Sequence, residues 1–179
     1  MRYQFRSGRL FKAIRGFLLA ATLLGVGLVT VESQAKDLTH RLGLGFTDQF
    51  SIQGSLPSIA VRYYPARDLG IAASLGVDTQ KNSSRFGFMA KVFRVIFVED
   101  NMNFYMGAGV GLISQETPGN NNDSGFELNG FAGGEFFFSG LESLGFNFEL
   151  GIGVTSISSE VRFRTLGDHP FRAGVTFYF

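Results

Sequence analysis

The chain of 179 residues contains no cysteine and only four prolines. Because no cysteine follows the apolar N-terminal run, a lipoprotein is excluded. The lack of cysteine does not identify the compartment, since oxidising compartments permit disulfides without requiring them. Long hydrophobic runs are also missing: from residue 36 onward, no uncharged stretch is long enough for a membrane-spanning helix. If this part of the chain enters a membrane, it must do so with strands.

The first 35 residues have the three-part layout of a secretory signal peptide. Residues 1–15 carry five basic residues and no acidic one, and residues 16–31 carry no charge. Ser33-Gln34-Ala35 then places small residues at the two positions that a signal peptidase reads. The uncharged run is a little shorter than the roughly 18 residues of a membrane span. We therefore expect cleavage rather than an anchor, with a mature domain over residues 36–179 and a Gram-negative source.

Removal of the leader changes the charge of the protein. The leader holds five of the 16 Lys and Arg residues and one of the 15 Asp and Glu residues, so the net charge moves from +1 to −3. A nucleic-acid partner then loses its electrostatic support. The mature chain has three lysines and uses glycine and phenylalanine heavily, and its length predicts one domain.

Apolar and polar or small residues alternate in eight segments of the mature chain, which is the period of a β-strand. The segments are roughly 38–47, 58–64, 69–78, 85–97, 102–113, 125–138, 144–155 and 170–179. Short turns follow the second, fourth and sixth segments, and longer polar loops are expected at 48–57, 79–84, 114–124 and 156–169. Short turns at one end and long loops at the other are typical of outer-membrane barrels.

The composition of the two strand faces distinguishes a membrane barrel from a soluble one. One face is rich in Phe, Leu, Ile and Val, which are too bulky for the inside of eight strands. The other face is dominated by glycine with a few charges of both signs, which suits a narrow lumen that side chains nearly fill. The sequence therefore predicts an all-β fold, an eight-stranded antiparallel up-and-down transmembrane β-barrel. Leu38 and His40 fall on its apolar outer face.

The last ten residues carry a more specific signal. Phe171, Ala173, Val175, Phe177 and Phe179 alternate with polar or small residues, and the sequence ends on Phe179. This pattern resembles the C-terminal signature of bacterial outer-membrane β-barrels, which the barrel-assembly machinery recognises in that family. The resemblance implies an assembly signal at Phe171, Val175, Phe177 and Phe179.

Charged side chains at inward positions are expected to pair inside the lumen, because an unpaired charge in a closed barrel is costly. The candidate network consists of Arg41, Arg62, Asp78, Lys91, Glu127, Glu135, Glu149 and Arg172. Glu135 and Glu149 lie on neighbouring strands, and we expect Arg172, Arg41 and Arg62 to compensate them. Balanced charges in a narrow lumen favour a sealed core over a pore or a proton path.

Catalytic and metal-binding patterns are weak. Ser156, Ser158, Ser159, Glu160 and His169 could in principle form a hydrolytic group, but their spacing matches no pattern. Residues 120–123 could hold Ca²⁺, but they are better interpreted as a loop tip. We therefore expect no catalytic residue, no metal and no cofactor.

By pattern, the whole mature chain resembles the OmpA/OmpX class of small eight-stranded outer-membrane barrels. The chain departs from the longer members of this class by ending at Phe179, so we expect no periplasmic peptidoglycan-binding domain. The resemblance implies a non-enzymatic role in envelope structure or as a scaffold for surface loops. It also implies contact with outer-membrane lipid and the assembly machinery, and a monomeric state. A lipid-modifying enzyme and a small channel or ligand-binding barrel are the alternatives.

The leader gives the first testable prediction. Protein isolated from a membrane fraction should begin at Lys36, because the basic, apolar and Ser-x-Ala segments together direct cleavage after Ala35. N-terminal sequencing measures this directly. Recovery of an intact Met1 terminus would instead support an N-terminal anchor.

Overall fold

The computed structural model describes residues 37–51, 55–81, 83–117, 121–158, 160–165 and 172–179, all within one compact unit. The expected signal peptide, residues 1–35, lies outside the described residues. The strands are β1 (Leu42–Ser51), β2 (Ser55–Ala66), β3 (Leu69–Asp78), β4 (Arg85–Glu99), β5 (Met102–Thr117), β6 (Asn121–Phe137), β7 (Leu144–Ile157), β8 (Glu160–Thr165) and β9 (Arg172–Tyr178). Over the described ranges, no helix is long and apolar enough to cross a membrane.

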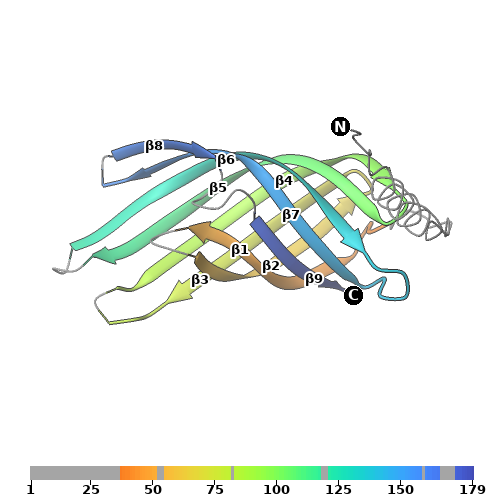
Figure 1. Cartoon of the computed structure of the whole chain (residues 1–179), viewed down its shortest axis with the longest axis horizontal. Helices are drawn as coiled ribbons and strands as arrows, with labels where there is room; N and C mark the ends of the chain where they lie inside the picture. Colours follow the sequence, from red (N-terminus) through yellow and green to blue (C-terminus); the bar gives the residue numbers. More distant parts are fainter. Residues whose placement is uncertain (1–36, 52–54, 82, 118–120, 159, 166–171) are drawn as a thin grey trace, which may run out of the picture. The chain divides into compact units, whose positions relative to one another are not determined.

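The strands form one closed sheet (Figure 1). Each strand from β1 to β7 pairs antiparallel with the next, and β9 pairs with both β7 and β1. One edge of β7 pairs with β6, and the other edge has two successive partners: residues 144–149 pair with β9, and residues 152–157 pair with β8. β8 and β9 are therefore two parts of one eighth strand. The prediction of an eight-stranded antiparallel barrel is confirmed.

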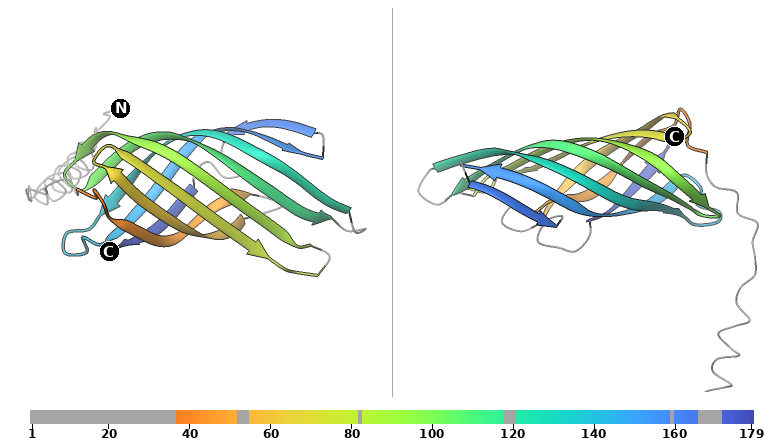
Figure 2. Two further views of the ribbon diagram at one scale, coloured as in Figure 1. Left: turned by 180° about the vertical axis from the view of Figure 1, so that it is seen from behind. Right: turned by 90° about the horizontal axis from the view of Figure 1, so that it is seen from above.

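The register of the strands fixes the tilt of the barrel. A path from Phe46 through the partners on β2, β3, β4, β5 and β6 reaches Ser156 on β7. The path in the other direction, through Val175 on β9, reaches Phe146 on β7. The two arrival points lie ten residues apart along β7, from 146 to 156. Such a stagger requires strongly tilted strands, roughly 35–45° from the barrel axis, and the front and back walls cross obliquely (Figure 2).

The two faces of each strand separate as the alternation predicts. On β1, for example, Leu44 and Phe46 are 50% and 67% exposed on the outer face, while Gly43 and Gly45 are buried inside. The inward glycines leave space for large neighbours. A Cβ at Gly43 would lie 2.6 Å from the Tyr178 ring, and one at Gly70 would lie 2.3 Å from the Phe93 ring. Glycine on the inner face is therefore what allows eight strands to enclose aromatic side chains.

Three of the four expected long loops are wrong in extent. β1 and β2 continue through most of residues 48–57, β5 and β6 through most of 114–124, and β8 occupies part of 156–169. The loop at 79–84 is confirmed, because β3 ends at Asp78 and β4 begins at Arg85. Polar outward residues end the apolar surface of a strand, but they do not end its backbone pairing. Ser114 and Ser124, for instance, are partners in the extended β5–β6 hairpin.

The first strand begins later than expected. A turn at Thr39 and His40 precedes β1, and His40 has a positive φ of 61°. The Thr39 side chain and amide both donate hydrogen bonds to Asp37 at this turn, which lowers the pKa of that carboxyl. Because the chain reverses here, Leu38 is 3% exposed and packs against the buried aromatic residues at the end of the barrel. Its expected outward position was wrong.

Candidate functional site

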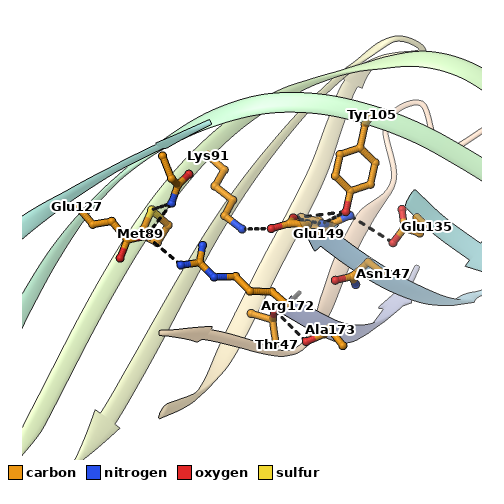
Figure 3. A network of polar contacts seen from close by, with 12 residues as sticks. Thr47, Met89, Lys91, Tyr105, Glu127, Glu135, Asn147, Glu149, Arg172 and Ala173 are labelled. Carbon is orange, nitrogen blue, oxygen red and sulfur yellow. Dashed lines mark hydrogen bonds and ion pairs between the residues drawn. The ribbon is translucent and has the colours of Figure 1, made fainter. Parts of the chain in front are cut away.

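The candidate site is the interior of the barrel, where charged side chains from five strands meet (Figure 3). Glu149 on β7 is its centre. One carboxylate oxygen of Glu149 lies 2.5 Å from Lys91 Nζ of β4, and the other lies 3.1 Å from Arg62 Nη2 of β2. All three side chains are 5% or 6% exposed. One carboxylate therefore joins three walls of the barrel through charge-assisted hydrogen bonds.

Glu135 on β6 is the most deeply buried acid, with a side chain that is 0% exposed. Its two oxygens accept hydrogen bonds from the Tyr64 hydroxyl at 2.9 Å and the Tyr178 hydroxyl at 2.7 Å. Arg62 Nη1 lies 3.5 Å from Glu135 Oε1, an ion pair without hydrogen-bond geometry. Arg62 Nη2 also donates to the Tyr105 hydroxyl at 2.9 Å. Arg62 thus compensates both Glu135 and Glu149.

Arg172 on β9 forms the third ion pair, and its partner differs from the expected one. It lies directly opposite Glu149 in the register of β7 and β9. Its Nη2 nevertheless donates to Glu127 Oε1 at 2.9 Å, and Asn129 donates to the same oxygen at 2.9 Å. Lys91 and Arg62 already occupy both oxygens of Glu149. The long Arg172 side chain instead reaches past β7 to an acid on β6, the next strand but one.

The structure brings six of the eight predicted charges together: Arg62, Lys91, Arg172, Glu127, Glu135 and Glu149. Three basic and three acidic groups balance in formal charge. Asp78 stays apart, because it pairs with Arg85 at the far end of the β3–β4 hairpin. Arg41 is half-buried just before β1 and takes no part in the ion pairs among these six residues.

Two apolar clusters flank this charged layer. Leu38, Tyr64, Phe93, Tyr105, Phe131, Phe137 and Tyr178 form an aromatic cluster toward the end that holds the chain's C-terminus. Phe50, Leu56, Met89 and Ile113 form a second cluster toward the long hairpins. The basic groups also contact rings: Arg62 Cζ lies 5.1 Å from the centroids of Phe93 and Tyr105, and Lys91 Nζ lies 4.8 Å from that of Phe131. Such contacts stabilise a desolvated cation.

The space left in the lumen is small. A cavity of about 20 Å³ lies among Gln49, Arg62, Lys91 and Glu149, which is room for about one water molecule. Gln49 Nε2 and two nitrogens of Arg172 have no hydrogen-bond partner among the described residues. These donors are suitable for ordered water. Over the same residues, no group of three or more His, Cys, Asp or Glu side chains could hold a metal ion.

Sequence reasoning missed the tyrosines of the network. Tyr64, Tyr105 and Tyr178 are each 1% exposed, and their hydroxyls contact the buried acids. Their inward parity and their hydroxyl groups were visible in the sequence. The sequence did not show at which position along the barrel axis each tyrosine lies, and therefore which acid on another strand it contacts.

The C-terminal candidate residues lie on the outer face. Val175, Phe177 and Phe179 are 38%, 53% and 62% exposed, and each alternates with an inward residue of β9. Phe171 and His169 lie outside the described residues. Ser158, one of the hydrolase candidates, donates a hydrogen bond to Asp123, and Glu160 pairs with Arg162 at 3.5 Å.

A comparison with solved structures shows a likeness to the N-terminal β-barrel domain of Pseudomonas aeruginosa OprF. The TM-score is 0.53 and the sequence identity 14%, and the match covers 78% of this chain and 96% of that domain. The fold is that of the OprF barrel. No family model matches the sequence, and no curated protein matches it. Likeness to OprF at this identity shows the fold alone, so function must be argued from the residues of the barrel.

The Arg172–Glu127 pair gives a prediction about stability. Arg172→Met should lower the free energy of unfolding by about 3–5 kcal/mol, because it leaves a buried carboxylate uncompensated. Adding Glu127→Gln should restore part of the loss, since the two residues are coupled. Urea unfolding, followed by circular dichroism, measures both effects.

The exposed pair of Arg94 and Asp68 provides the matched control, with side chains 75% and 52% exposed. Arg94→Met should change stability by about 0–1 kcal/mol. A strictly additive Arg172→Met, Glu127→Gln double variant would show that the two side chains do not interact.

Proposed function

We propose that the protein is a non-enzymatic integral outer-membrane barrel, which serves envelope structure or presents surface loops. The distribution of polarity between its two faces supports this proposal most strongly. Large apolar side chains such as Val110, Leu150 and Phe177 are 52–53% exposed on the outer face, while Glu127, Glu135 and Glu149 are 0–4% exposed inside. This arrangement suits a closed barrel with lipid around it and its own polar core.

The filled lumen argues against a channel. The aromatic and aliphatic clusters lie on either side of an electroneutral charged layer, and the cavity between them holds about one water molecule. An ion entering this path would have to displace ion pairs that are already formed. The interior is therefore better suited to holding the strands in register than to conduction.

The hairpins opposite the C-terminal end support a role as a loop scaffold. β5 and β6 are 16 and 17 residues long, well beyond the roughly 9–11 residues of a membrane-spanning strand. The Ser84 hydroxyl donates to Glu116, which ties the start of β4 to the β5–β6 hairpin. Ser158 is likewise joined to Asp123 across β7 and β6. These contacts give the projecting hairpins a defined arrangement that a surface partner could recognise.

The terminal phenylalanine gives a prediction about assembly. Phe179→Ser should reduce the amount of protein in the outer membrane and leave export to the periplasm intact, because the expected assembly signal is weakened. The direct cost in the folded barrel should be small, since penalties for polar groups fall toward the edge of the membrane. Fractionation and heat-dependent gel mobility measure localisation and folding.

Phe163→Ser on β8 is the matched control, because Phe163 is 70% exposed on the outer face but lies outside the last ten residues that carry the expected assembly signal. It should leave outer-membrane abundance near the wild-type value. Equal abundance of Phe179→Ser and wild type would mean that the terminal residue does not direct assembly.

The sealed lumen gives a prediction about conductance. The folded protein should leave a planar lipid bilayer without unitary currents, since two apolar clusters flank the charged layer. Insertion is verified on the same preparation by its shift in gel mobility after heating. Stable unitary currents would favour the channel alternative over the proposed function.

A further inference from the structure

The outer surface of the barrel contains a groove where β1, β9 and β7 lie side by side. Its volume is about 560 Å³, which is within the range of sites for small ligands, about 300–1,000 Å³. We call it the β1–β9–β7 groove. Phe46, Pro57, Phe146 and Phe148 are among the residues that form its walls, and Ala173 and Gly174 lie between them.

The hollow arises from the register of the three strands. Phe46, Val175 and Phe146 are successive partners across β1, β9 and β7. In the next outward row, Phe148 is the partner of Ala173, whose side chain is a single methyl group. A small residue between larger neighbours leaves a depression that an alkyl chain can enter. The lining is mostly apolar, with Thr47, Asp48 and Asn147 as its polar members, so an alkyl chain in this groove meets mainly apolar side chains.

One carboxylate lies at the edge of the groove toward the β1–β2 hairpin. Asp48 is the partner of Pro57, which points outward, so Asp48 shares the outer face with Phe46 two residues earlier. Asp48 Oδ1 accepts a hydrogen bond of 2.5 Å from the Ser55 hydroxyl. Among the described residues, no basic side chain pairs with Asp48. A carboxylate on an apolar membrane surface is costly unless a cation or a donor accompanies it.

We propose that the β1–β9–β7 groove binds one acyl chain of a bilayer lipid whose headgroup carries an ammonium group, and that Asp48 contacts this ammonium. The inference rests on the proposed function, because the outer face must meet lipid. The groove selects an alkyl chain by its apolar walls, and Asp48 selects the headgroup by charge complementarity. A bound lipid of this kind would supply the counter-charge that the described residues do not give to Asp48.

The absence of tryptophan from the chain allows a specific fluorescence test. Phe148→Trp places a reporter in the groove wall, and Val110→Trp places one on the outer face of β5, away from it. Each variant is reconstituted into vesicles that contain acyl-brominated phosphatidylethanolamine or acyl-brominated phosphatidylglycerol. The ratio of the apparent binding constants for the two lipids is compared within each variant, so differences in reporter depth cancel.

We expect the groove reporter to prefer the ethanolamine lipid by about two- to fivefold, the factor that corresponds to an exposed ion pair. The Val110→Trp reporter should show a ratio near one. In the Phe148→Trp background, Ala173→Phe should remove the preference by filling the groove, and Asp48→Asn should remove it by removing the charge. Ala132→Phe, on the outer face of β6, is the control for Ala173→Phe.

Each other outcome has a distinct meaning. Equal ratios for the two reporters, or a preference that persists in Asp48→Asn, would overturn the lipid site while leaving the barrel in the membrane. Quenching at Val110→Trp without quenching at Phe148→Trp would overturn it in favour of a protein surface over the groove. No quenching of either reporter in protein with a heat-shifted gel mobility would contradict the membrane placement itself, and with it the proposed function.

Discussion

The sharing of Glu149 between Lys91 and Arg62 is the interaction on which the interior depends. These three side chains come from β7, β4 and β2, so they connect walls of the barrel that are distant around its circumference. Arg62 extends the connection to Glu135, and through it to the hydroxyls of Tyr64 and Tyr178. Because these groups are nearly inaccessible to water, each must find its partner inside the protein. A different stagger of the strands would place these partners at different heights and leave charges uncompensated.

Glycines on the inner face of the strands provide the space that the large inward side chains need. Gly43 and Gly70 lie next to the rings of Tyr178 and Phe93, and a methyl group at either position would collide with the ring. In this narrow barrel, Tyr178 and Phe93 therefore fit because their cross-strand partners on the neighbouring strands, Gly43 and Gly70, have no side chain. The aromatic cluster, the charged layer and the aliphatic cluster fill the lumen in sequence, and little free volume remains. This filling makes the interior a core and leaves the outer surface and the hairpins as the places where partners can bind.

The outer surface is uniform in chemistry but uneven in shape. Most outward positions carry Leu, Ile, Val or Phe, whereas Ala173 leaves a depression between aromatic walls. Asp48 places a carboxylate at the edge of that depression. In a membrane, a shape that accepts a chain and a charge that accepts a headgroup would together distinguish one lipid from its neighbours. The proposed functional roles of the barrel and the groove thus depend on opposite faces of the same strands.

The sequence by itself determined the fold class and the assignment of faces. Alternation along residues such as Leu42, Gly43, Leu44, Gly45 and Phe46 has a period of two, and this period depends only on the local geometry of a strand. The inward parity of the six paired charges followed from the same periodicity. The extent of the hairpins did not, because backbone pairing continues where the side chains become polar.

Only the tertiary structure decided which charges meet. Arg172 is opposite Glu149 in the register but pairs with Glu127, and Asp78 pairs locally with Arg85. Leu38 turns inward because the chain reverses at His40. The stagger of ten residues along β7 is a property of the closed sheet and is not contained in any one strand. Whether a side chain points into or out of the barrel depends on its neighbours along the chain. Its position along the barrel axis and the residue it pairs with depend on how the whole barrel closes.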